Sequence, residues 1–206
     1  MNTVRTSSCD EYTEWYLKRD MCKGNRDSVP RRARKRRKIM KTPAAQGGHC
    51  GKWRDWYECA DWSIIRITQD EFERLIPIEN PWTEENLTSY ERNGDDYRLL
   101  RNVVNAIISR SKEEGGFLEC SEMAGYMKYY NPLKYGHMRI EGIHRIVLHS
   151  LVPNEKEHNP SGFFYLQDGW GRSFPHQILI TEGHLSYEPV EAFLAYLPDS
   201  KLEAYG

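Results

Sequence analysis

The most regular hydrophobic pattern in the chain lies between Asp95 and Glu114. Aliphatic residues recur there at helical spacing: Leu99, Leu100, Val103, Val104, Ile107 and Ile108. Apolar positions three and four residues apart form one face of an α-helix, so this pattern predicts an amphipathic helix. Gly115 and Gly116 follow it and favour a helix end.

Three other segments also have apolar residues at helical spacing: residues 121–131, Met138–Leu151 and Pro189–Leu197. Their apolar positions are Met123, Ala124, Met127, Ile143, Ile146, Val147, Leu151, Val190, Phe193, Leu194 and Leu197. We therefore predict a helix in each segment. Near the N-terminus, a fourth short amphipathic helix is predicted from Tyr12, Trp15, Tyr16 and Leu17.

The segment Ser63–Ile67 is rich in isoleucine and predicts a strand. Thr68 follows it, and Glu71 stands three residues later, which is the spacing of a capping box. We expect a helix to begin there, to include Phe72, Leu75 and Ile76, and to end near Pro77.

A β-hairpin is expected near the C-terminal end, with strands at Gly162–Leu166 and Gln177–Ile180 around the turn Asp168-Gly169. Three helices followed by a hairpin is the element order of a winged helix-turn-helix module. The fold class predicted is therefore α+β, with a three-helix plus hairpin body that resembles a winged helix.

Charge divides the chain into two predicted parts. Residues 1–60 hold 15 Lys and Arg against 7 Asp and Glu, a balance of +8. Residues 61–206 hold 14 against 23, a balance of −9, although the net charge of the whole chain is only −1. We expect a basic, aromatic head at 1–60, with an exposed arm at 30–48, and an acidic α+β body at 61–206.

The arm carries the strongest binding signal in the sequence. Between residues 31 and 41 stand Arg31, Arg32, Arg34, Lys35, Arg36, Arg37, Lys38 and Lys41. Such a run neutralises phosphates without a fixed fold, so we expect it to bind DNA or RNA. Two alternatives are a nuclear-localisation signal and docking on an acidic protein partner.

In the body, the winged-helix hypothesis makes Met138–Leu151 the recognition helix and Gln167–Ser173 the wing. The basic residues that would then contact nucleic acid are Arg139, Arg145 and Arg172. Ile143, Ile146 and Val147 would face the core.

The cysteines suggest a second kind of site. Cys9, Cys22, Cys50 and Cys59 lie within the first 60 residues together with His49. Thiolates and imidazole suit zinc, which would stabilise a small basic head. The alternative is ordinary buried cysteines, because no Cys-x2-Cys pair occurs.

The segment Gly142-Ile143-His144-Arg145-Ile146-Val147, with Pro153-Asn154, resembles a stretch of phage-type HNH homing endonucleases. The resemblance implies strands at 126–128 and 138–140 and a helix that begins with His144. The Asn-His-x-Asp-Gly signature of that family is absent here, so the resemblance implies an inactive relative rather than an active nuclease.

No phosphate-binding loop, dinucleotide fingerprint, zinc-protease or serine-hydrolase motif occurs. No apolar run has the length of a membrane span, and the first ten residues contain no apolar signal segment. Five cysteines favour a reduced, intracellular protein, either cytoplasmic or nuclear. The sequence thus predicts a non-enzymatic nucleic-acid-binding protein; the alternatives are a small viral or phage-type antagonist that blocks a host protein through its acidic body, and a degenerate HNH-like nuclease.

Overall fold

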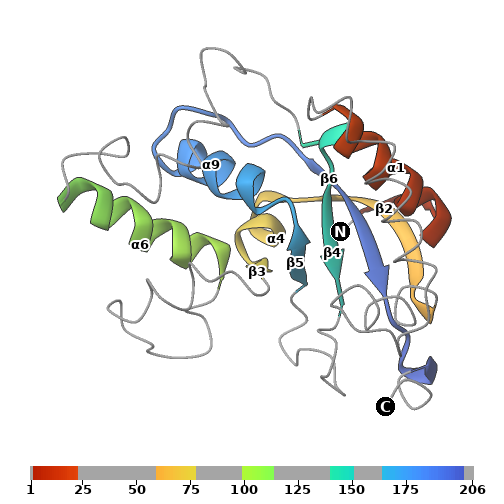
Figure 1. The fold of residues 1–206 in the computed structure, drawn as a ribbon. Coiled ribbons are helices and arrows are strands. Elements are labelled where there is room, and N and C mark those ends of the chain that lie inside the picture. The colour runs from red at the N-terminus through yellow and green to blue at the C-terminus, as the bar shows by residue number, and fades with distance from the viewer. Residues whose placement is uncertain (1, 23–58, 78–98, 114–139, 151–163, 202–206) are drawn as a thin grey trace, which may run out of the picture.

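A computed structural model describes residues 2–22, 59–77, 99–113, 140–150 and 164–201 of the chain (Figure 1). The elements in these ranges follow in chain order. They are β1 (Asn2–Thr6), α1 (Cys9–Cys22), β2 (Asp61–Ile67), α4 (Gln69–Glu73), β3 (Ile76–Pro77), α6 (Leu100–Glu113), the 3-10 turn η3 (Gly142–His144), β4 (Ile146–His149), β5 (Tyr165–Asp168), α9 (Trp170–Thr181) and β6 (Val190–Tyr196).

The strands form one mixed six-stranded sheet in the order β1-β2-β6-β4-β5-β3. Pairing is antiparallel between β1 and β2, between β2 and β6 and between β4 and β5. It is parallel between β6 and β4 and between β5 and β3. The N-terminal strand is thus at one end of the sheet, and the C-terminal strand β6 lies inside it.

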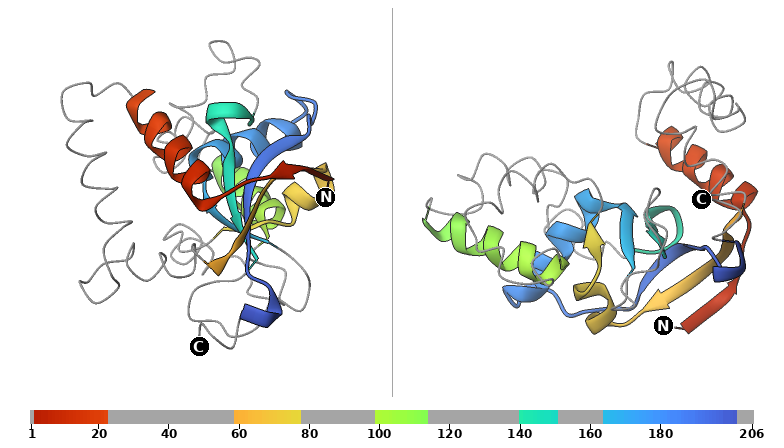
Figure 2. Two further views of the ribbon diagram at one scale, coloured as in Figure 1. Left: turned by 90° about the vertical axis from the view of Figure 1, so that its right-hand side faces the viewer. Right: turned by 90° about the horizontal axis from the view of Figure 1, so that it is seen from below.

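Helices cover both faces of the sheet. One face packs against α4, α6 and α9 through residues such as Ile65, Leu148 and Phe174. The opposite face packs against α1 through residues such as Ile64, Val147 and Phe193. Figure 2 shows α1 on one side of the strands, with α6 and α9 on the other. The architecture is therefore α+β, with the sheet between two helical layers.

Aromatic side chains fix α1 to the sheet. Tyr12 stacks on Trp62 of β2, with ring centroids 4.6 Å apart and planes 17° apart. Trp15 contacts Phe193 of β6 at 5.1 Å and donates its indole N–H to the carbonyl of Gly142 at 2.9 Å. Because both aromatic residues are buried, α1 is an integral part of the core.

Several predicted elements are confirmed in the described ranges. The helix expected at 95–114 is α6, and the short helix around Tyr12–Leu17 is α1. The strand Ser63–Ile67 is β2. The capping box at Thr68 and Glu71 is present with both of its hydrogen bonds, although α4 ends at Glu73. Ile76 and Pro77 form β3 instead of a last helical turn.

Two of the predicted helices are wrong. Within Met138–Leu151, the described residues form η3 and then strand β4. Residues 190–196 of Pro189–Leu197 form strand β6. Both strands are central and buried on both faces, so nearly every position is apolar. A continuous apolar run satisfies helical spacing as well as strand spacing.

The predicted hairpin is also wrong. Its first leg corresponds to β5, but its return leg, Gln177–Ile180, lies within helix α9, which accommodates Pro175. Gly169 therefore joins a strand to a helix and is not part of a β-turn. The winged-helix order is not reproduced, because its recognition helix is a strand and its wing is the junction of β5 and α9. The helix that the HNH resemblance expects at His144 is absent for the same reason.

The predicted division at residue 60 crosses one continuous sheet. β1 pairs with β2, and Tyr12 and Trp15 share a cluster with Val147 and Phe193. Residues 2–22 therefore pack directly on the body. The arm at 30–48 and the helix expected at 121–131 lie outside the described residues. In the ranges that are described, no helix is long and apolar enough to cross a bilayer.

Candidate functional site

Two of the predicted nucleic-acid contacts, Arg145 and Arg172, lie in the described part of the chain. The structure brings them together, because the Arg172 Nη2 donates to the backbone carbonyl of Arg145 at 2.9 Å. The other predicted contacts are outside the described residues: Arg31, Arg32, Arg34, Lys35, Arg36, Arg37, Lys38, Lys41 and Arg139.

A row of polar side chains crosses the sheet beside Arg145. Arg66 of β2 is paired in register with Asn2 of β1 on one side and with Glu191 of β6 on the other. Arg145 immediately precedes Ile146, which pairs with Ala192, so it continues the row at the start of β4. Register partners share a face, and we call Asn2, Arg66, Glu191 and Arg145 the arginine row.

The arginine row lies on the face that α1 covers. Arg66 stands two residues after Ile64, and Glu191 stands two residues before Phe193; both of these apolar residues belong to the cluster under α1. Strand side chains alternate between faces, so Arg66 and Glu191 point to the same side as that cluster. The row therefore continues the aromatic core as a charged border.

Glu191 is the centre of the arginine row. Its Oε2 accepts from Nε of Arg145 at 2.8 Å and lies 2.7 Å from Nη2 of the same residue, while its Oε1 accepts from Nη2 of Arg66 at 3.0 Å. Burial raises the pKa of this carboxyl, but the hydrogen bonds and charges of Arg145 and Arg66 outweigh burial and hold the pKa below its ordinary value. Glu191 is therefore ionised at neutral pH.

Arg145 is largely enclosed by these contacts. Its side chain is 20% exposed, and its guanidinium carbon lies 5.6 Å from the centroid of the Phe193 ring. A guanidinium over an aromatic ring is attracted by the ring quadrupole. Arg145 thus links the turn before β4 to strand β6, and most of its surface is used within the chain.

A second ion pair borders the row. Both terminal nitrogens of Arg5 in β1 donate to the carboxylate of Glu11 in the first turn of α1. The Arg5 hydrogen bond lowers the pKa of Glu11 to about 2, aided by a hydrogen bond from Ser7 and by the charge of Arg145. The same contact raises the pKa of Arg5. Together with the row, this gives three arginines, Arg5, Arg66 and Arg145, around two carboxylates.

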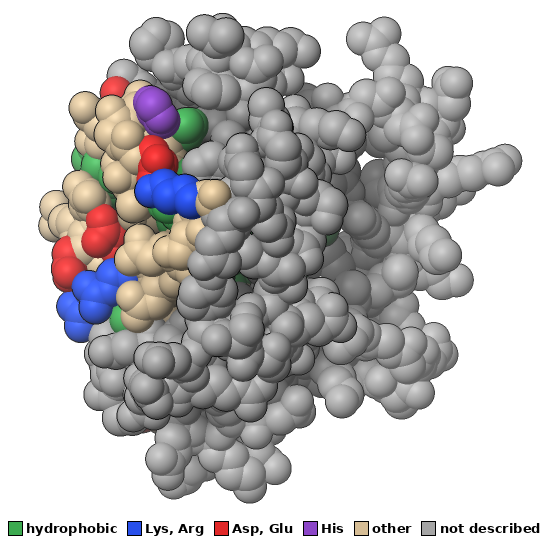
Figure 3. All heavy atoms as spheres, turned by 90° about the vertical axis from the view of Figure 1, so that its left-hand side faces the viewer, with side chains coloured by type: hydrophobic (Ala, Val, Ile, Leu, Met, Phe, Trp, Pro, Cys, Tyr) green, Lys and Arg blue, Asp and Glu red, His purple; other side chains and the backbone are tan. Residues whose placement is uncertain are grey.

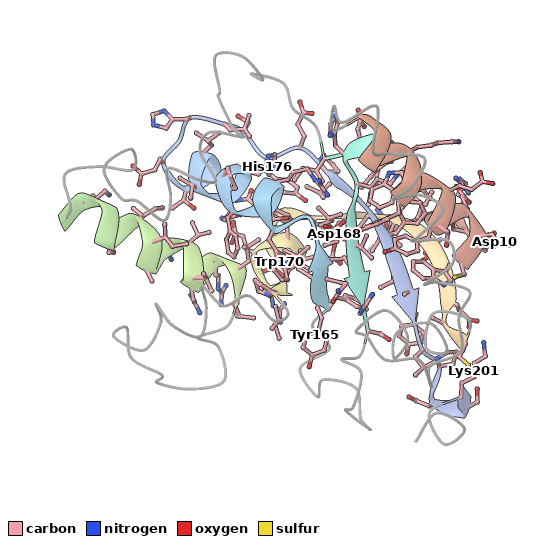
Figure 4. The ribbon with its side chains drawn as sticks, viewed as in Figure 1. Asp10, Tyr165, Asp168, Trp170, His176 and Lys201 are labelled. Atoms are coloured by element: carbon pink, nitrogen blue, oxygen red, sulfur yellow. The ribbon has the colours of Figure 1, made fainter. Side chains whose placement is uncertain are left out.

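The junction of β5 and α9 positions Arg172. Gly169 has a φ of +106°, and a Cβ there would stand 2.6 Å from Cγ2 of Ile146. Only glycine combines this conformation with so close an approach to β4. Figure 4 labels Asp168 and Trp170 on either side of this position, where the strand meets the helix. Arg172 follows in the first turn of α9, within reach of the Arg145 carbonyl.

The chemistry of the site favours anion binding over proton transfer. Glu11 and Glu191 both have a lowered pKa, so neither is a good proton donor at neutral pH. Arginine stays protonated throughout and presents a planar fork of donors that matches phosphate and carboxylate groups. The arrangement can therefore hold an anion or a structural ion pair.

The predicted zinc ligands are not assembled in the described residues. Cys9 and Cys59 are not in a disulfide, and both pack against the aromatic cluster beneath α1. The backbone of Cys22 ends α1, and His49 and Cys50 lie outside the described residues. No three His, Cys, Asp or Glu side chains in the described ranges gather to form a metal site. The zinc site stays a prediction.

Sequence reasoning missed Arg5, Glu11, Arg66 and Glu191. The only local signal is that Arg66 interrupts an isoleucine-rich strand and Glu191 an apolar one, which marks the end of a buried face. On the face shown in Figure 3, the described side chains carry both signs of charge side by side, with no uniform basic patch among them.

The comparisons with known proteins assign no role to these residues. The chain matches no protein-family model, and no curated protein or solved structure is significantly similar to it.

Proposed function

We propose that the chain is a non-enzymatic, intracellular nucleic-acid-binding protein that uses the basic arm at 30–48. The observation that carries this proposal is the density of charge, with eight Lys and Arg between residues 31 and 41. Each phosphate that such side chains neutralise releases a counterion, so the arm binds DNA or RNA without a folded recognition element.

The position of the arm in the sequence supports the proposal. It lies between α1 and β2, two elements that pack together through Tyr12 and Trp62. Because this basic segment is joined at both ends to one core, its charges stay close to a nucleic acid that contacts the core. Its effective concentration near a bound strand is thereby raised.

The proposal does not need a winged helix. That form of the hypothesis requires a recognition helix at Met138–Leu151, where the described residues form η3 and β4. Arg145 and Arg172 are held by contacts within the chain, and Arg139 lies outside the described residues. The arm is therefore the primary binding element of the proposal.

The test compares the full-length chain with a variant in which Arg31, Arg32, Arg34, Lys35, Arg36 and Arg37 are replaced by Ser. The ratio of nucleic-acid to protein absorbance, before and after a high-salt wash, reports bound nucleic acid in purified protein. Affinity for a labelled duplex should fall with salt at a slope of about −0.9 per phosphate contact, and the variant should flatten that slope. Unchanged affinity of the variant for both DNA and RNA would remove the arm from the proposal.

A second function is favoured by a different observation, the −9 balance of residues 61–206. An acidic body suits an antagonist that covers a basic surface on another protein. This function predicts a stoichiometric complex with a basic protein that survives nuclease treatment. A nucleic-acid-binding protein would lose its partner under the same treatment, so one pull-down separates the two.

A further inference from the structure

The arginine row, together with the bordering Arg5–Glu11 pair, changes from buried to exposed across the sheet. The side chain of Glu191 is 9% exposed and that of Arg145 is 20% exposed, whereas Arg66 is 54% exposed and Arg5 is 50% exposed. The two carboxylate–arginine contacts at Glu191 thus lie inward, and the outer part holds the Arg66 guanidinium and the exposed Arg5–Glu11 ion pair. A ligand that approaches from the β1 end of the sheet meets the exposed guanidinium of Arg66, which is only partly neutralised, and the Arg5–Glu11 ion pair.

Arg66 retains donors for such a ligand. A guanidinium carries five N–H groups, and the polar contact that Arg66 makes in the described structure uses Nη2 alone, towards Glu191. Because the Arg66 side chain is more than half exposed, its Nε and Nη1 can donate hydrogen bonds to a ligand. Glu191 meanwhile holds Arg145 as well, so the carboxylate neutralises Arg66 only in part.

Register places Arg5 on the same face as Arg66. Arg5 pairs with Ile64, and Arg66 stands two residues further along β2, so both side chains project to the α1 side. Neighbouring strands lie about 5 Å apart, so one extended polyanion can reach both side chains. The three arginines outnumber the two carboxylates, Glu11 and Glu191, that they surround.

Phosphate suits this surface better than a peptide strand does. A peptide would add to the edge of β1, but the pairing of β1 is interrupted by a register shift between Thr3 and Arg5. In addition, Nη1 of Arg5 donates to the carbonyl of Thr6 at 3.1 Å, which occupies an acceptor that an added strand would need. Bulges and charged side chains of this kind protect sheet edges from strand addition.

We propose that Arg66 and Arg5 form a phosphate-contacting surface at the β1 end of the sheet, which binds the backbone of a nucleic acid. This inference rests on the proposed function and assigns part of the binding to the folded body. The contacts are to phosphate, so they carry no base preference.

The test uses the full-length chain and a fluorescein-labelled oligothymidine strand, with binding followed by anisotropy over a range of salt concentrations. Arg66→Gln should weaken binding by about tenfold and reduce the magnitude of the salt slope by about 0.7. Arg66→Lys keeps the charge and should keep most of the slope. Arg74→Gln is the matched control, because Arg74 also pairs with a carboxylate, Asp70, at 3.1 Å and is exposed.

A gain of binding gives an independent check. Glu11→Gln removes the carboxylate that holds Arg5, so affinity should rise and the salt slope should steepen. Thermal melting of each variant checks that the fold is retained. We expect Arg66→Gln to fold, because Glu191 stays paired with Arg145. If Arg66→Gln and Arg74→Gln bind alike, or if Glu11→Gln fails to strengthen binding, the surface is wrong.

The outcomes for the surface and for the arm are separable. Loss of binding in the arm variant, with Arg66→Gln unaffected, contradicts the surface and leaves the proposed function intact. Loss in Arg66→Gln, with the arm variant unaffected, supports the surface and contradicts the arm. Wild-type protein that binds neither probe contradicts both.

Discussion

Glu191 holds a negative charge on a side chain that is 9% exposed, and two guanidinium groups share it. A charge in such a position is tolerated only when its hydrogen bonds are satisfied. Arg145 supplies two of its close contacts and Arg66 supplies one. The contribution of each arginine to stability should therefore differ, with Arg145 the more important.

Arg145→Ala should lower the free energy of unfolding by about 1–3 kcal/mol, because it leaves an enclosed carboxylate with one weaker partner. Urea denaturation of the variant measures this loss. The same substitution in a Glu191→Gln background should cost clearly less, since the charge that needs Arg145 is gone. Equal losses in the two backgrounds would show that Arg145 acts through packing on Phe193 instead.

The sequence identified Arg145 as a functional candidate but could not supply its partner. An arginine has the same chemical character whether it meets a phosphate or a carboxylate, and Glu191 lies 46 residues further along the chain. Arg66 and Glu191 are separated by 125 residues. Contacts of this kind depend on strand register, which local spacing does not encode.

At the scale of elements, some local signals were confirmed, whereas others, including the Asp168-Gly169 turn, were wrong. The capping box of Thr68 and Glu71 and the apolar stripe of α6 depend on residues three or four apart, and both are confirmed. β4 and β6 are buried on two faces, and their continuous apolar runs read equally well as helices. Packing against helices decides that these segments are strands and not helices. The helices that pack against β4 are distant in sequence, so local spacing does not reveal them.

The junction between β5 and α9 depends on one residue. Gly169→Ala should destabilise the protein by about 2–4 kcal/mol, because alanine would be strained at a φ of +106° and its Cβ would overlap Ile146. Gly142→Ala is the matched control, since that residue also has a positive φ, +57°, but nothing lies within 4 Å of its Cβ position. The control should lose only about 1–2 kcal/mol in denaturant unfolding. Similar losses for the two variants would mean that close approach to β4 is unimportant.

At the scale of the whole molecule, the change in charge along the sequence does not coincide with a break in the sheet. The change from +8 to −9 near residue 60 suggested two parts, whereas β1 and β2 are hydrogen-bonded neighbours. Charge is distributed over the surface, and sheet pairing is decided by buried residues such as Ile64 and Ile65. The change in composition therefore falls between two strands, β1 and β2, that are neighbours in one sheet.

The stability of the whole molecule should depend on two buried histidines. Burial lowers the pKa of His149 to about 3 and that of His176 to about 4, against an ordinary value of 6.5. Both are neutral in the folded state, and the unfolded chain takes up protons first as pH falls. Stability is thus fully present above pH 6.5 and declines towards pH 4, by up to about 2–3 kcal/mol per pH unit.

Urea denaturation between pH 7 and pH 5 measures this decline, in a range where Glu11 and Glu191, whose pKa values are lowered, stay ionised in the folded protein. His176→Phe should reduce the slope by about half, because phenylalanine keeps an aromatic ring against Phe72 and Tyr187 without a titrating group. A stability that is flat from pH 6.5 to pH 5 would show that both histidines can be protonated in the folded protein, contrary to the burial that lowers their pKa.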